Sequence, residues 1–147
     1  MQRSQEFLLK GHRDSFLKKA TLFADDFSHF SLCQSNDISY PHEPFSTLLA
    51  IGACAVFEAE QNSFDELLKF HQGEWLFGFF GYDLKNQTES LQSQHENHTC
   101  FRDIGFFKPE ILIEFESDKI RISATDPEAV FQSISSLQFP KEVPCLN

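Results

Sequence analysis

The chain has 147 residues and a formal net charge of −10, with 12 Lys and Arg against 22 Asp and Glu. Proteins that bind nucleic acids need clustered basic residues, and residues 25–66 contain eight acidic residues and no Lys or Arg. We therefore expect neither a nucleic acid nor an anionic membrane surface as a partner. Hydrophobic residues make up 41% of the chain and 18 residues are Phe, so one domain with a sizeable core is feasible.

The sequence also bears on the compartment. No apolar run approaches the roughly 20 residues of a membrane helix, and residues 1–10 lack the charged-then-apolar plan of a signal peptide. We expect a cytoplasmic protein in which the widely spaced cysteines are free thiols. These cysteines are Cys33, Cys54, Cys100 and Cys145.

The first half of the chain predicts a helix, several strands and a second helix. Apolar residues at helical spacing follow Asp14, which we expect to cap the first helix. Residues 29–33 alternate as a short strand does, and residues 47–51 form a buried strand. Residues 53–59 are expected to continue as another strand. The capping box S-F-D-E at 63–66, in which the Ser hydroxyl accepts from the N3 amide, predicts the start of a second helix.

The strongest apolar run is W-L-F-G-F-F-G-Y, residues 75–82. Because it is apolar at every position, we predict a central strand that is covered on both faces. Gly78 and Gly81 weaken such a strand unless another segment packs close to its backbone. The polar stretch that follows, residues 85–101, is predicted to be mostly loop.

The last third predicts a hairpin and a helix. Residues 111–115 and 119–124 alternate between apolar and polar around a polar turn, and Asp126 with Pro127 is typical of a helix start. The strands arrive in adjacent pairs rather than in strict strand–helix–strand alternation. We therefore predict an α+β domain with a largely antiparallel sheet that is flanked by helices.

Two groups of side chains have the residue types of a reactive site. His95, His98 and Cys100 are spaced as three metal ligands could be, but no second ligand pair accompanies them, so a polar loop is the simpler interpretation. His29 and Cys33 share a strand face about 13 Å apart, which is too far for proton transfer. Neither group predicts a catalytic constellation.

Polar residues end two of the predicted strands. Ser35 and Asn36 fit either turn chemistry or contact with a small polar ligand. Asp83 follows the apolar run, where a sheltered carboxylate must find a donor or its pKa rises. It either caps the following turn or faces a cleft or a neighbouring domain, with Glu89 beside it if residues 84–91 are helical.

Three sequence elements, in the same order, resemble the N-terminal region of chorismate-utilising synthases. The first is L-C-Q-S at 32–35, similar to the family's L-[LF]-x-S. The second, at 78–91, is G-F-F-G-Y-D-L followed by E-S-L, similar to G-x-x-G-Y-[DE]-L and E-x-L. The third is F-F-K-P-E-I-L-I at 106–113, similar to a strand entered through aromatic-x-Pro. The matching motif residues of the second element include Gly78, Gly81, Tyr82, Asp83 and Glu89.

Within the family, the residues of the second element, G-Y-D-L followed by E-S-L, are most similar to the aminodeoxychorismate synthase branch. Anthranilate synthase is the alternative. The resemblance implies amination of chorismate with ammonia from a partner glutamine amidotransferase subunit. Residues 1–147 then correspond to a single N-terminal domain. Magnesium and the catalytic groups are expected in a C-terminal chorismate-binding domain that this chain lacks. We therefore expect the chain alone to be inactive and its own C-terminal domain to be its second partner.

In the family, the L-x-x-S element helps to line a tryptophan pocket at the domain interface. The resemblance implies Leu32 and Ser35 as ligand-binding residues. Feedback-regulated members often have Glu before the Ser, where this chain has Gln34, whose amide oxygen accepts from an ammonium group without charge assistance. An effector site and a purely structural role both stay open. A stand-alone amino-acid-binding module and an interaction domain unrelated to chorismate are further alternatives.

Overall fold

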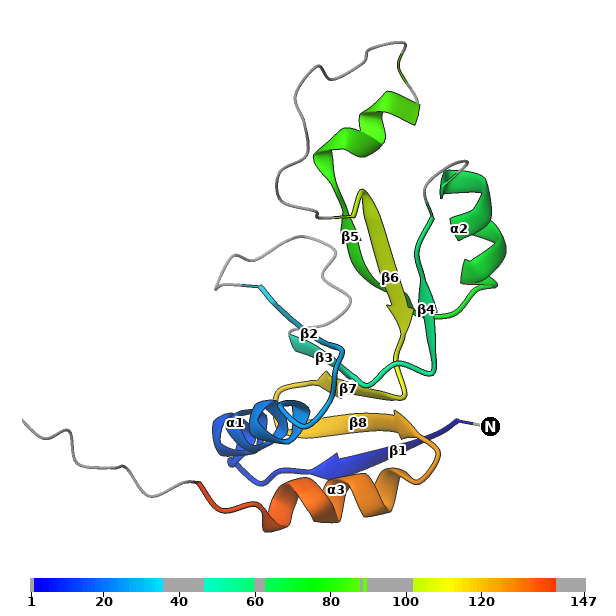
Figure 1. Ribbon diagram of the computed structural model, residues 1–147. Helices are drawn as coiled ribbons and strands as arrows, with labels where there is room; N and C mark the ends of the chain where they lie inside the picture. Colours follow the sequence, from blue (N-terminus) through cyan, green and yellow to red (C-terminus); the bar gives the residue numbers. More distant parts are fainter. Residues whose placement is uncertain (1, 36–46, 60–62, 88, 90–101, 140–147) are drawn as a thin grey trace, which may run out of the picture.

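A computed structural model describes residues 2–35, 47–59, 63–87, 89 and 102–139, which form two antiparallel sheets and four helices (Figure 1). The predicted α+β class and the antiparallel pairing are confirmed, but the strands form two sheets where one was expected. The five-stranded sheet has the order β1 (Arg3–Leu8), β8 (Lys119–Ala124), β7 (Ile111–Phe115), β3 (Thr47–Ile51) and β2 (Phe30–Gln34). The three-stranded sheet has the order β4 (Ala55–Phe57), β6 (Ile104–Lys108) and β5 (Phe77–Phe80). The helices are α1 (Arg13–Ala24), α2 (Ser63–His71), the 3-10 helix η1 (Tyr82–Gln87) and α3 (Pro127–Ser136).

The main core lies between one face of the five-stranded sheet and the helices α1 and α3. Strand residues at every second position point into it, as the predicted period of two requires. Ile113, Phe115 and Ile122 are fully buried there. The Asp126 carboxylate accepts from the backbone amide of Ala129 at 3.1 Å, which confirms the predicted cap of α3.

The opposite face of the same sheet is divided in two. Around β3 and β7 it is apolar, and Leu48, Ala50 and Leu112 pack against Phe77 and Phe107 of the three-stranded sheet. Around β1 and β8 it is charged instead. The small sheet therefore covers only part of the large one, and the charged part faces outward.

A third cluster lies on the far side of the three-stranded sheet, beneath α2 and η1. Phe57, Leu84 and Ile104 are buried in it, with Leu67 and Phe70 of α2 packed alongside. Within the described residues no helix is long and apolar enough to cross a membrane.

Several local predictions are confirmed. The structure has the predicted helices α1, α2 and α3 and the predicted hairpin at 111–124. It also has strands near residues 29–33, 47–51 and 53–59. The predicted cap of α1 is wrong. His12 is the N-cap residue and its side chain makes no capping bond, while Asp14 lies in the first turn, where its charge favours the helix dipole.

The predicted capping box at Ser63 is also wrong. Ser63 is the first residue of α2, and Gln87 of η1 satisfies it: Gln87 Nε2 donates to Ser63 Oγ and the Ser63 amide donates to Gln87 Oε1, both at 2.9 Å. A side chain from a distant segment thus replaces the local capping bond.

The prediction that residues 75–82 form a central strand covered on both faces is wrong as well. β5 contains only residues 77–80, and within the described part of the chain it pairs with β6 alone, at the edge of its sheet. Three of its four residues are exposed. Two strands, β1 and β6, were not predicted from the sequence.

Candidate functional site

The motif segment occupies β5 and η1, and its glycines are required by the packing of the backbone. A Cβ atom added at Gly78 would lie 2.7 Å from the Cα of Phe106, and one at Gly81 would lie 2.9 Å from the Cα of Asp103. The Gly81 amide donates to the Asp103 carbonyl at 2.6 Å. Both glycines therefore allow the close backbone approach that the sequence suggested.

Three of the six residues of η1 are exposed, whereas Leu84 is buried in the core beneath it. Tyr82 is 83% exposed, and the Lys85 ammonium lies 4.2 Å from the centre of its ring. Lys85 also forms an ion pair with Asp83 at 3.3 Å, so the Asp83 carboxylate has the donor that it needs. The Glu89 amide donates to the Lys85 carbonyl, and the Glu89 side chain is exposed. Asp83 thus lies in η1, whereas Glu89 is an exposed bend residue outside that helix.

An apolar patch surrounds the motif on the outer side of the three-stranded sheet. We define the outer patch as Phe64, Leu68, Phe80 and Tyr82. The rings of Phe64 and Phe80 stack at 6.0 Å, and Phe80 contacts Phe106 edge-on at 4.9 Å. Phe64 and Leu68 lie one turn apart on α2 and are 45% and 73% exposed. Exposed apolar side chains that gather in one region, as the stacked Phe64 and Phe80 rings do, are typical of interaction surfaces.

The residues of the predicted effector pocket lie at the edge strand β2. In the antiparallel register Leu32 is opposite Leu49 and Gln34 is opposite Thr47, so these two share the face that α1 covers. Leu32 lines a shallow hollow with Leu17 and Thr21 of α1. Ser35 follows the strand and is half-buried. Their role as ligand-binding residues stays a prediction.

The other sequence candidates are placed only in part. The His29 ring contacts Phe107 at 5.4 Å, while Cys33 packs between the two sheets with its sulfur 3.9 Å from the Ser31 hydroxyl. These partners give no sign of a Cys–His pair. Among the described residues no group of three His, Cys, Asp or Glu side chains could hold a metal ion. Asn36, His95, His98 and Cys100 lie outside the described residues.

A recess of about 580 Å³, which nothing in the sequence signalled, opens between the start of β2 and the inner face of the three-stranded sheet. Four strands or their flanks contribute to it. Val56, Phe79, Gly105 and Phe107 form its apolar lining, with Glu58 and Arg102 beside them. Its polar residues from the β2 side are Ser28, His29 and Ser31.

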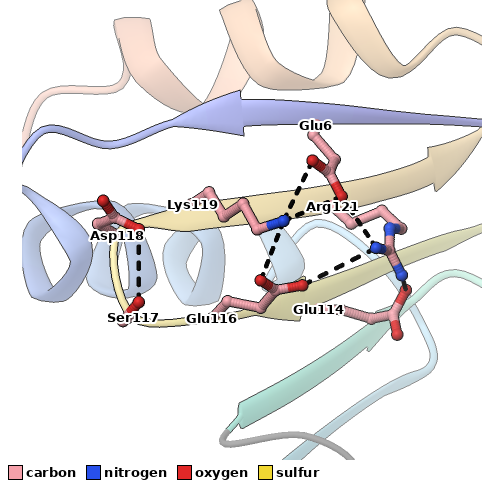
Figure 2. A network of polar contacts seen from close by, with 7 residues as sticks. All are labelled: Glu6, Glu114, Glu116, Ser117, Asp118, Lys119 and Arg121. Carbon is pink, nitrogen blue, oxygen red and sulfur yellow. Dashed lines mark hydrogen bonds and ion pairs between the residues drawn. The ribbon is translucent and has the colours of Figure 1, made fainter.

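The charged part of the five-stranded sheet holds a network of ion pairs (Figure 2). We call Glu6, Glu114, Glu116, Lys119 and Arg121 the charged face. Arg121 and Lys119 donate to the Glu6 carboxylate at 2.9 and 3.2 Å, and these bonds hold its pKa below the ordinary value. Bonds to Glu116 and Glu6 raise the pKa of Lys119. The network joins three strands at the surface.

Comparisons with known proteins do not assign the chain. No protein-family model matches it, and no curated protein is significantly similar to it.

Proposed function

We propose that this chain is the non-catalytic N-terminal domain of a chorismate-aminating synthase of the aminodeoxychorismate type, the para-aminobenzoate branch. The observation that carries the proposal is the combination of the G-F-F-G-Y-D-L segment with the outer patch. The segment that resembles the family also bears apolar side chains that no described part of the chain covers, among them Phe80 at 55% and Tyr82 at 83% exposed. A domain that docks on another domain needs such a surface.

In this role the chain supplies a folded scaffold and a docking surface, and the chemistry belongs to a chorismate-binding domain. That domain would bind chorismate and magnesium, and ammonia would come from a glutamine amidotransferase subunit. The net charge of −10 fits this division of labour, because a dianionic substrate is better held by a less acidic surface. The resemblance implies the same domain arrangement for the anthranilate synthase branch, which differs in its product.

Reconstitution from two parts tests the proposal. The chain is mixed with a separately purified chorismate-binding domain of an aminodeoxychorismate synthase, and association is measured by sedimentation and calorimetry. We expect the two to bind and the ammonia-dependent conversion of chorismate to increase, with no turnover by the chain alone. The product, aminodeoxychorismate or anthranilate, distinguishes the two branches. A folded chain that neither binds the domain nor changes its activity contradicts the proposal.

A matched pair of variants shows whether the outer patch is the docking surface. Leu68→Ser combined with Tyr82→Ser removes apolar area from two highly exposed side chains, so the fold should be retained. We expect binding to the catalytic domain to weaken at least about tenfold, as for central residues of an interface. Leu8→Ser is the control, because Leu8 is 66% exposed and lies on β1 of the other sheet. Equal loss in both variants would contradict this placement.

A further inference from the structure

The recess beside β2 has the size and lining of a small-molecule site. Its volume of about 580 Å³ lies within the usual range of ligand pockets, roughly 300–1,000 Å³. Gly105 is one of its lining residues, and a Cβ atom added there would lie 3.0 Å from the Phe79 ring. The Phe79 ring therefore lies close against the backbone of β6. Val56 and Phe107 continue this apolar lining across the sheet.

One charged pair and several hydrogen-bonding groups border this apolar surface. Arg102 forms an ion pair with Glu58, and their side chains are 62% and 42% exposed, so both are accessible to a ligand. The ion pair uses one terminal nitrogen of the guanidinium group. Because that group carries five N–H donors in a planar fork, it can hold a second carboxylate beside Glu58.

The β2 side of the recess adds polar groups of its own. Ser28 Oγ lies 2.9 Å from His29 Nδ1. When the hydroxyl donates to Nδ1, the proton of the neutral ring is on Nε2, which then serves as a further donor. The His29 ring also contacts the Phe107 ring in a tilted arrangement, so it borders the apolar wall as well. With Arg102 included, the recess combines a flat apolar wall with hydrogen-bond donors.

We propose that this recess binds an aromatic monocarboxylate, with its ring against Phe79 and Val56 and its carboxylate on Arg102. A planar ring matches the apolar surface that the Phe79 ring, lying against Gly105, forms with Val56, and a single carboxylate matches the guanidinium fork. A polyanion fits poorly because Glu58 lies beside Arg102, which is the one Lys or Arg among the described residues of the lining. A neutral aromatic compound fits less well, because it offers no carboxylate to accept charge-assisted hydrogen bonds from Arg102.

This proposal does not depend on the docking of a catalytic domain. Phe79 and Phe80 are neighbours in β5, so they point to opposite faces of the sheet. Phe79 lines the recess, whereas Phe80 belongs to the outer patch. Failure of one site therefore leaves the other to be judged separately.

Titration of the ¹⁵N-labelled chain with 2-naphthoate tests the proposal by NMR. We expect saturable shifts of amide signals, concentrated at His29, Val56, Phe79 and Gly105. 2-Naphthamide has the same shape without the charge and should bind at least about tenfold more weakly, since charge-assisted hydrogen bonds are about twice as strong as neutral ones. 2-Naphthylmethylamine should also bind more weakly. Absence of saturation, shifts elsewhere, or tighter binding of the amine would overturn the proposal.

Two substitutions in the ion pair should change the affinity in opposite directions. Arg102→Gln removes the fork, and we expect it to weaken 2-naphthoate binding about tenfold. Glu58→Gln removes the competing carboxylate and should strengthen binding severalfold. Arg3→Gln on β1 is the control, because it makes the same change of charge on the other sheet. The amide spectra of all three variants report whether the fold is intact. Unchanged binding in Arg102→Gln, or weaker binding in Glu58→Gln, would overturn the proposal.

Discussion

Both sheets of this protein are rich in apolar side chains, but these are buried to different extents. In the five-stranded sheet, Phe and Ile side chains at alternate positions lie under α1 and α3 and are fully buried. In the three-stranded sheet, consecutive residues of β5 are apolar, yet Phe79 and Phe80 are 40% and 55% exposed. Apolar content alone therefore does not show how a strand is covered. The large sheet has a completed core, whereas the small one retains surfaces for further contacts.

Glycine makes the second difference between the sheets. The strands of the five-stranded sheet contain no glycine, and their side chains fill the space beneath the helices. The three-stranded sheet has Gly78 and Gly105 within its strands and Gly81 just after β5. Each brings another chemical group close to the backbone. The small sheet thus depends on close backbone packing, and it has room for a recess where the large sheet has side chains.

The largest expected effect comes from truncating one phenylalanine in each sheet. Phe115→Ala removes a fully buried ring that packs near Phe16, and we expect a loss of about 3–5 kcal/mol in the free energy of unfolding. Phe80→Ala removes a ring that is more than half exposed, and the loss should be about 1 kcal/mol, mostly its aromatic contacts. Urea denaturation followed by circular dichroism measures both.

The test is the difference between the losses in the free energy of unfolding of Phe115→Ala and Phe80→Ala. Similar losses at the two positions would mean that β5 is buried in the protein in solution, for example by self-association. Sedimentation of the wild-type chain at several concentrations separates that case from an error in the fold. A small loss in Phe115→Ala would contradict the core of the five-stranded sheet itself.

The parts of the fold that could be predicted are those with local signals. The hairpin at 111–124 has strict alternation around a polar turn, and α3 has an Asp-Pro start, so both were predicted correctly. β1 has no such pattern, because five of its six residues are exposed. It is held by a ladder of six residue pairs with β8, more than a hundred residues away in the chain. Backbone pairing of this kind leaves little trace in the sequence.

The candidate site could likewise be predicted only where its sequence signal is local. The motif glycines could be predicted to need close packing, since a glycine inside a strand suggests it. The recess could not, because its lining comes from segments near 28–31, 56–58, 78–79 and 102–107. The bond between Gln87 and Ser63 spans 24 residues. A local capping pattern was visible there, and the tertiary contact replaced it.

A smaller effect should separate two glycines of the three-stranded sheet. Gly78→Ala places a Cβ atom 2.7 Å from the backbone of Phe106, so β5 and β6 must move apart, and we expect a loss of about 1–3 kcal/mol. Gly105→Ala meets only the far edge of the Phe79 ring, at 3.0 Å. That ring is partly exposed and can turn, so this variant should lose less.

Hydrogen exchange and urea denaturation measure the two glycine variants. In Gly78→Ala we expect faster exchange of amides in β5 and β6, with the amides of β7 and β8 unaffected. Equal stability of both variants would show that β5 is not held against β6 as closely as the structure has it. Faster exchange in the large sheet would show instead that the two sheets unfold as one unit.

The smallest expected effect concerns the charged face, where polar rather than apolar contacts join the strands. The bonds from Arg121 and Lys119 lower the pKa of Glu6, so its ionised form favours the folded state. This stabilisation is fully present above the unfolded pKa of about 4.3 and is lost as the pH falls through the lower folded pKa. Glu6→Gln should therefore have a slightly lower urea midpoint than the wild type near neutral pH, and the difference should disappear in acid.

The difference between the two urea midpoints should also shrink in about 1 M salt, which screens exposed charges. Glu110→Gln, an exposed acidic residue outside the charged face, is the control. A difference that grows as the pH falls would show that Glu6 favours the folded state in its protonated form, and the ion pairs of this face would then be wrongly assigned.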